Sequence, residues 1–555
     1  MLSIHPIFQA SERVLEQLLF HEPERATLLG VEGHDDRWAD RSPDGHEALV
    51  DTVESCEREL AGLPGATDRW DRLAVAVAAA ELGSLRIHHE TGEARRDLNS
   101  IASPFQDYRQ TFDYAPRSSD ADWANIARRL ESLGDAMAGY LATLEYGASR
   151  GETVAARQIA EVIRQARVVE SDRSPFLGLA REYGAGPLAG RLEVAIDAGR
   201  AAFGSFADGL ESGLLRTAPD ADAVGPERYA RAVDHFVGDT IDLHEAYAWG
   251  WTEIAAILDR MRTVAGEIVS GGSIADAVHL LKTDPARSVD SQSAFVAFAQ
   301  ERIDAALGRL SGDHFDVPPQ IMRCDVKMAP PGGALGAYYV SPSEDFTRPG
   351  TVWWSMGDDD RPIPLYDEVT TSYHEGFPGH HLQSGVQLTI ADRLSRLHRL
   401  WVWKSGSGEG WALYAERLMD ENGFLEEPDY VFGYLAAQMH RACRVVIDIG
   451  SHLRLAIPDG QPFHPGEQWT YDTGVEMLER YSTISRENAR SEMNRFLGWP
   501  GQAIAYKIGE REILRLRDES RRPGGEVLTV RDFHARLLEL GAIDMRLLRQ
   551  FVLDE

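Results

Sequence analysis

The sequence is poor in cysteine, in lysine and in net positive charge. Its 555 residues contain three cysteines, Cys56, Cys324 and Cys443, which lie far apart and show no paired spacing. Such a set forms neither a disulfide framework nor a cysteine zinc site. There are 57 basic and 88 acidic residues, for a formal net charge of −31. Nucleic-acid binding depends on basic residues that neutralise phosphates, so we expect no nucleic-acid partner, and an anionic membrane surface is disfavoured for the same reason.

The chain also lacks long apolar segments. No stretch approaches 18 uninterrupted apolar residues, so we expect no membrane span. The first residues lack the basic start and apolar run of a signal peptide, and we therefore expect a cytoplasmic protein. The hydrophobic content of 43% is ordinary for a globular protein. Because 555 residues are many for a single core, we expect two lobes, an N-terminal helical lobe over residues 1–315 and a second lobe over residues 316–555.

The pattern of apolar residues predicts helices over most of the chain. Up to about residue 310 these residues recur at intervals of three and four. The clearest predicted helices cover residues 123–144, 153–168, 187–211 and 226–264. The stretch 318–355 is instead rich in Val, Tyr, Trp, Gly and Pro and predicts a small sheet. Its candidate strands are residues 320–327, 336–340 and 350–355, and helices return from residue 367 almost to the end.

A histidine-rich stretch follows the predicted sheet. His374 and Glu375 end a predicted helical segment, and His380 and His381 follow a Pro-Gly step. Histidine is the commonest zinc ligand, and a Glu beside a ligating His can act as a base on metal-bound water. In the usual metalloprotease motif the two histidines are four residues apart, but the residue at that spacing here is Pro378.

The spacing allows a shared metal only if the helix is distorted. In a regular helix His380 would lie roughly 120° around the axis from His374, and His381 on the order of 10 Å further along it. Pro378 favours distortion, since its ring clashes with the carbonyl group of His374, and Gly379 tolerates almost any backbone angle. The alternative is that His374 caps or packs against a helix and that Pro-Gly simply ends it. Spacing alone leaves both interpretations open.

Acidic, basic and aromatic residues further along the chain complete the candidate set. Residues 408–416 predict a helix that carries Glu409 and Glu416, either of which could be a carboxylate ligand. Arg444, Asp448 and His452 recur every four residues and so share one side of a predicted helix with apolar surroundings. Arg444 could hold a substrate carboxylate there, or could form an ordinary helix-stabilising ion pair.

The motifs resemble those of a known family. His374-Glu-Gly-Phe-Pro-Gly-His380-His-Leu-Gln resembles the pattern His-Glu-x-x-Pro-Gly-His-x-x-Gln of the bacterial domain of unknown function 885. It is also similar to a stretched form of the His-Glu-x-Gly-His pattern of the gluzincin oligopeptidases and carboxypeptidase Taq. That similarity implies His374, His380 and Glu409 as metal ligands, with His380 favoured over His381 and Glu409 over Glu416.

Two further segments share in the resemblance. Residues 499–509 match the family signature Pro-Gly-Gln-Ala-x-x-Tyr-Lys-x-Gly, where gluzincin oligopeptidases carry tyrosines that stabilise the tetrahedral intermediate. This implies Tyr506 as an oxyanion donor. Apart from the resemblance, His452 is a further candidate for contact with the substrate oxyanion. Gluzincins also bind extended peptide along a strand beside the zinc helix, which implies that residues 336–340 do so, with Tyr338 or Tyr339 facing the cleft and Tyr339 as the candidate substrate contact.

The resemblance therefore implies a zincin-like metallopeptidase fold, mainly α and two-lobed, with a small β-sheet beside a deep cleft between the lobes. Zinc would be the cofactor, although manganese, cobalt or iron suit the same ligands. Glu375 would deprotonate the bound water, and the substrate would be a short peptide cleaved in the manner of a carboxypeptidase or dipeptidase. Two alternatives stay open: hydrolysis of a non-peptide amide or ester, and a metal-free helical binding protein. The chain could also form a homodimer.

Overall fold

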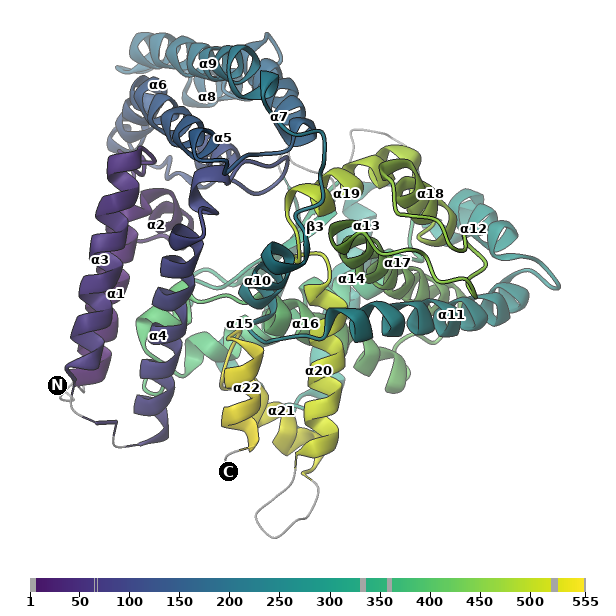
Figure 1. Ribbon diagram of the computed structural model, residues 1–555. Coiled ribbons are helices and arrows are strands. Elements are labelled where there is room, and N and C mark those ends of the chain that lie inside the picture. Colours follow the sequence, from purple (N-terminus) through teal and green to yellow (C-terminus); the bar gives the residue numbers. More distant parts are fainter. Residues whose placement is uncertain are drawn as a thin grey trace. The chain divides into compact units, whose positions relative to one another are not determined.

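Helices dominate the protein, as the sequence predicts (Figure 1). The computed structural model describes residues 6–63, 65–66, 68–329, 336–356, 362–520 and 528–553. Residues 1–5, on which part of the signal-peptide expectation rests, lie outside this set. None of the helices described combines the length and apolar character that a membrane crossing requires.

The chain forms two compact units. Unit 1 comprises Met1–Asp222, Ser395–Trp401 and Leu497–Trp499, and unit 2 comprises Ala223–Leu394, Val402–Phe496 and Pro500–Glu555. The first boundary therefore differs from the one expected at residue 315. The reason is that the helices between residues 226 and 310 pack within unit 2, and no change of composition marks this, because both sides of residue 222 are helical.

Unit 1 is a set of packed helices around an aromatic core. Its helices are α1 (Pro6–His21), α2 (Pro23–Leu29), α3 (Pro43–Ala61), α4 (Arg69–Glu90), α5 (Pro104–Tyr114), α6 (Asp120–Ser149), α7 (Ala156–Glu170), α8 (Leu177–Tyr183) and α9 (Ala189–Ser212). Helix α6 contacts α9, and α7 lies against the same helix (Figure 1). Buried rings such as Phe105, Tyr140 and Phe206 pack between them. This burial is the main source of stability for the unit.

Unit 2 contains the remaining helices and the sheet. Its helices are α10 (Pro226–Val237), α11 (Leu243–Ile268), α12 (Ile274–Thr283), α13 (Gln292–Leu310), α14 (Glu368–Glu375), α15 (His380–Thr389), α16 (Ser405–Glu421), α17 (Pro428–Leu453), α18 (Tyr471–Tyr481), most of α19 (Arg486–Gly498), α20 (Ala505–Glu519), α21 (Val530–Leu538) and α22 (Met545–Leu553). Helix α17 lies against α11, and α16 against α20 (Figure 1). The apolar run Val445, Val446, Ile447 and Ile449 of α17 is fully buried, as its composition predicts.

The predicted sheet is present beside α13 and α14. Strand β4 (Gly350–Ser355) lies in the middle, with β2 (Cys324–Met328) parallel and β3 (Gly336–Val340) antiparallel to it. Two-residue strands β1 (Ser288–Val289) and β5 (Ile363–Pro364) form a separate pair. Trp354 of β4 packs edge-on against Phe295 of α13 at 4.9 Å between centroids, which anchors the sheet to the helices.

One predicted helix is two helices. The segment 226–264 breaks into α10 and α11 at Gly238, which adopts a left-handed conformation with φ of 71°. Asp242 then caps α11 by accepting hydrogen bonds from the backbone N–H groups of His244 and Glu245. A left-handed glycine followed by an Asp cap is a standard helix end and restart, and it overrides the continuous apolar periodicity.

Candidate metal centre

The chain between His374 and His380 is not a continuous helix. Helix α14 ends at Glu375 and α15 begins at His380, so residues 376–379 form a break. The break brings the two imidazole rings to 4.9 Å between centroids at 82°. The distortion expected at Pro378 is therefore present, as a break between two helices rather than a bulge within one.

Two features hold this break in place. A Cβ atom on Gly379 would lie 1.9 Å from the carbonyl oxygen of His374, so a larger residue requires the backbone to move. Nε1 of Trp411 donates to the carbonyl oxygens of Pro378 at 2.9 Å and Gly379 at 3.2 Å. These buried carbonyl groups are thereby satisfied, and Trp411 ties the break to α16.

Helix α16 supplies two acidic side chains. Glu409 and Glu416 are seven residues apart, close to two helical turns, and so lie on one side of the helix. On another side α16 packs closely on α20, since a Cβ atom on Gly410 would lie 2.5 Å from the carbonyl carbon of Gly509. This contact fixes α16 against the helix that carries Tyr506.

Three side chains place donor atoms around one point. Oε2 of Glu409 lies 3.3 Å from Nε2 of His374 and 3.5 Å from Nε2 of His380. One ligand atom from each residue lies within 4.8 Å of the other two. Ligands about 2.0–2.2 Å from a tetrahedral zinc ion stand about 3.3–3.6 Å apart. The two distances from Glu409 fall in this range, so the three side chains could hold one divalent ion.

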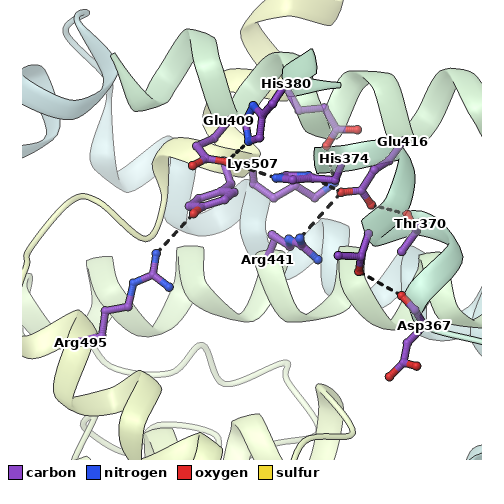
Figure 2. A network of polar contacts seen from close by, with 12 residues as sticks. Asp367, Thr370, His374, His380, Glu409, Glu416, Arg441, Arg495 and Lys507 are labelled. Carbon is purple, nitrogen blue, oxygen red and sulfur yellow. Dashed lines mark hydrogen bonds and ion pairs between the residues drawn. The ribbon is translucent and has the colours of Figure 1, made fainter. Parts of the chain in front are cut away.

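Glu416 orients the first histidine. Nδ1 of His374 lies 2.7 Å from Oε1 of Glu416, and Thr370 donates to the other carboxylate oxygen at 2.7 Å (Figure 2). A proton on Nδ1 makes that contact a hydrogen bond and directs Nε2 toward Glu409, which is the arrangement of a metal-ligating histidine with a carboxylate behind it. Burial lowers the pKa of His374, but the hydrogen bonds to Glu409 and Glu416 outweigh this effect and raise the pKa to about 9. The acidic side chains around His374 thus favour a positive charge on its ring.

His381 is held elsewhere. Its Nε2 lies 2.8 Å from the carbonyl oxygen of Ile321, and its Nδ1 lies 3.0 Å from the hydroxyl oxygen of Tyr339. The side chain is fully buried. Since both ring nitrogens are engaged, the geometry separates His381 from the cluster and leaves His380 in it.

Comparison with known proteins places the chain in a family. Residues 23–552 match the family described as "Bacterial protein of unknown function (DUF885)". The chain belongs to this family. None of the curated proteins compared with this DUF885 protein matches it.

Two solved structures share the fold of this DUF885 protein. The "putative lipoprotein from Colwellia psychrerythraea" is similar with a TM-score of 0.84 at 21% identity, over 98% of both chains. The "putative lipoprotein of unknown function from Shewanella oneidensis" is similar with a TM-score of 0.74 at 16% identity, over 98% of this chain and 99% of that one. At these identities the likeness concerns the fold alone.

A cavity of about 500 Å³ opens onto the cluster. All its lining residues belong to unit 2. The predicted position of the cleft, between two lobes, is therefore wrong. The reason is that α14 to α17, α20 and β3 all belong to this one unit. Glu375 lines the cavity beside the histidines, and burial raises the pKa of its carboxyl group, against the lowering effect of His380 and His374.

Tyr506 and Tyr339 both line the cavity. Tyr506 lines the cavity and its ring lies parallel to that of His374, at 6.4 Å between centroids. Its hydroxyl oxygen accepts a 3.4 Å hydrogen bond from Arg495. Tyr339 also lines the cavity, from strand β3, with its hydroxyl group on His381.

The residues predicted to share one side of α17 do not all face the cavity. Arg444 lines the cavity, but it is paired with Glu492 through Nε at 3.0 Å and a second nitrogen at 2.8 Å. His452 is fully buried away from the cavity lining. One ring nitrogen accepts from the N–H group of Val224, and the other donates to the carbonyl group of Phe496. The expected contact of His452 with substrate is therefore not met, because the helix turns this side chain into the core.

The sequence did not predict one residue of the site, Arg441, or the position of another, Glu416. Arg441 lines the cavity from α17, three residues before Arg444, and this spacing on one helix face is the signal that could have identified it. Glu416 enters the sequence analysis only as an alternative ligand, whereas it lies behind His374. Its distance of two turns from Glu409 fits both roles, and only the position of α14 distinguishes them.

Proposed function

We propose that this protein is a metal-dependent hydrolase that cleaves amide bonds of short peptides, in the manner of a carboxypeptidase or dipeptidase. The observation that carries the proposal is the spacing of His374, His380 and Glu409 on one side of a cavity, with the first histidine oriented by Glu416. Zinc suits two imidazoles and one carboxylate, and manganese, cobalt or iron suit the same set. A zincin-like metallopeptidase fold is part of what we propose.

The side chains around the cavity have separate roles. A divalent metal ion bound by the three ligands would polarise the scissile carbonyl group and acidify water. Glu375 takes a proton from the attacking water and passes it to the leaving amine, so that the C–N bond breaks while the water oxygen joins the acyl carbon. Its raised pKa makes it a stronger base than an exposed carboxylate. The hydroxyl group of Tyr506 donates a hydrogen bond to the oxyanion.

The size of the cavity supports a small substrate. About 500 Å³ is within the range of pockets that enclose small molecules. A folded protein chain does not enter such a volume, whereas a peptide of a few residues does.

We expect no nucleic-acid or membrane partner, given the net charge of −31. A homodimer stays a prediction.

The first test is metal content, measured by elemental analysis of wild type, His380→Ala and His381→Ala. We expect about one metal ion per chain in wild type and in His381→Ala, and none in His380→Ala. His381→Ala is the matched control, since it removes the adjacent imidazole and the two contacts described above. No bound metal in wild type, even after zinc is added, would overturn the proposal and favour a metal-free binding protein.

The second test is hydrolysis. A panel of short peptides, non-peptide amides and esters is assayed with wild type and with Glu375→Gln. We expect peptide cleavage that falls by several orders of magnitude in the variant, with metal content unchanged. Cleavage of the amides or esters alone would replace the peptidase by a different hydrolase on the same site.

The cell compartment is a separate question. The sequence predicts a cytoplasmic protein, but both similar structures are described as lipoproteins, and this favours a location outside the cytoplasm. Fractionation of cells that express the full-length gene product distinguishes the two.

A further inference from the structure

Two arginines of α17 line the cavity, and they differ in how their charge is used. Arg444 is bound to Glu492 through two contacts of 3.0 and 2.8 Å. The same carboxylate also contacts His440 at 3.2 Å and Arg495 at 3.3 Å. The guanidinium of Arg444 is thus already held by a well-anchored carboxylate. The Cζ atom of Arg444 also lies 5.0 Å from the centroid of the Tyr506 ring.

Arg441 has an ion-pair partner only at longer range, in Glu416. Its Nε atom is buried and makes no hydrogen bond to any residue that the structure describes. The nearest carboxylate oxygen to its guanidinium is Oε1 of Glu416 at 3.8 Å, which is beyond hydrogen-bonding distance. Glu416 already accepts hydrogen bonds from His374 and Thr370. A guanidinium offers five N–H donors, so Arg441 retains most of its capacity for a planar acceptor in the cavity.

The position of Arg441 relative to the ligand cluster limits what it can bind. Its terminal nitrogen and Nδ1 of His374 contact the same oxygen of Glu416, at 3.8 and 2.7 Å (Figure 2). These two nitrogens are therefore separated by no more than the sum of those distances. One residue of extended peptide spans about 3.3–3.6 Å. Nδ1 is the ring nitrogen of His374 on the side away from Glu409, so a group bound to Arg441 lies within a few residues of a peptide bond at the cluster.

The charges around the cavity favour an anionic group at this point and disfavour it elsewhere. Glu375 and Glu409 line the cavity beside the histidines and repel a carboxylate. Arg444 is neutralised by Glu492. Among the described residues, Arg441 is therefore the cavity-lining arginine whose guanidinium has no hydrogen-bonded carboxylate.

We propose that Arg441 binds the free C-terminal carboxylate of the substrate. This inference rests on the proposed hydrolase function and narrows it: the substrates are short peptides with an unblocked C-terminus, which is released on the leaving fragment. A planar carboxylate matches the guanidinium fork in a bidentate manner. The carboxylate receptor is thus Arg441, one helical turn before the Arg444 that the sequence suggests.

The test compares two ligands that differ only at the C-terminus. Binding of N-acetyl-trialanine and of its C-terminal amide is measured by calorimetry on the metal-free protein. We expect the acid to bind about 10- to 100-fold more tightly, on the scale of a charged hydrogen-bonded pair. Arg441→Gln should remove this preference and leave binding of the amide unchanged. Equal affinity of the wild type for both ligands overturns the inference, and this comparison needs no variant to fold.

Arg444→Gln is the contrasting variant. We expect it to lower the melting temperature, because it removes one of the cationic partners of the partly buried Glu492, and to keep the preference for the acid. Loss of the preference with Arg444→Gln and its retention with Arg441→Gln would assign the receptor to Arg444 and overturn the inference.

The two proposals can fail separately. Preference for the acid in a protein that binds no metal supports the carboxylate site while the hydrolase proposal falls. Equal cleavage of acid and amide peptides by a metal-loaded protein overturns the role of Arg441 while the hydrolase stands.

Discussion

Nδ1 of His374 lies 2.7 Å from a carboxylate oxygen of Glu416, and both groups are buried. This contact settles which nitrogen of His374 faces the cavity and prevents the ring from turning. It also links α14 to α16, so that the histidine and Glu409 are held by the same pair of helices. The orientation of the cluster is therefore built into helix packing before any ligand arrives.

The contact predicts a specific effect on metal affinity. Glu416→Ala removes the acceptor from Nδ1 and lets the imidazole rotate, so we expect the affinity for zinc to fall about 10- to 100-fold. The measurement is competition with a chelator of known affinity. Glu416→Gln is the matched control, since its amide oxygen still accepts from Nδ1, and it should lose much less. An alanine variant with wild-type affinity would show that Glu416 does not orient the ligand.

The helix break predicts an effect of a single methyl group. Gly379→Ala places a Cβ atom 1.9 Å from the carbonyl oxygen of His374, so we expect a loss of at least about 2 kcal/mol in unfolding free energy and a loss of bound metal. Gly308→Ala, in α13, is the control, because a Cβ atom there meets nothing within 4 Å. It should raise stability by about 0.5–1 kcal/mol. A fall in melting temperature with Gly379→Ala and a rise with Gly308→Ala would confirm the contrast. An unchanged melting temperature with Gly379→Ala would refute it.

The sequence predicts the secondary structure well where local signals agree. The strands at residues 336–340 and 350–355 are found at those limits, because β-branched and aromatic residues between Gly and Pro leave few alternatives. The predicted break at Pro378 and Gly379 follows from sterics alone. Spacing alone leaves open whether His374 shares a site with a later histidine, and only the family resemblance favours His380 over His381.

Other features depend on packing between distant segments. Nothing local shows that Glu416 lies behind His374, because this depends on the placement of α14 against α16. Periodicity places Arg444 and His452 on one helix side, yet the first faces the cavity and the second the core, since neighbouring helices cover the last turn of α17. The boundary between the units lies between two helical regions of similar composition, and only contacts reveal it.

A buried acid predicts a pH dependence of stability. Oδ2 of Asp448 accepts hydrogen bonds from Tyr229 at 2.8 Å and from the N–H group of Gly501 at 2.9 Å, and Nε2 of His452 lies 3.5 Å from the other oxygen. Burial raises the pKa of Asp448 to about 7, although these hydrogen bonds lower it. The unfolded chain releases this proton near pH 4.

The sign follows from proton binding. Between about pH 4 and 7 the folded chain holds a proton that the unfolded chain has lost, so this group's contribution to stability is complete below pH 4 and is lost as pH rises to 7. The loss amounts to at most roughly 4 kcal/mol. Asp448→Asn keeps an acceptor oxygen and cannot ionise. We expect the melting temperature of the variant, relative to wild type, to rise between pH 5 and pH 8. The same difference at both pH values would contradict the assignment.

The position of Tyr506 predicts a purely kinetic effect. Its ring lies parallel to that of His374, and its hydroxyl oxygen accepts from Arg495, so the hydroxyl proton is free to be donated into the cavity. Tyr506→Phe should lower kcat about 100-fold or more, the usual result of removing one oxyanion donor, with metal content and KM little changed. Tyr339→Phe is the control: its hydroxyl group is already held by His381, and its loss should reduce stability more than kcat. If Tyr506→Phe instead raised KM alone, the hydroxyl group would bind the ground state and another donor would have to stabilise the oxyanion.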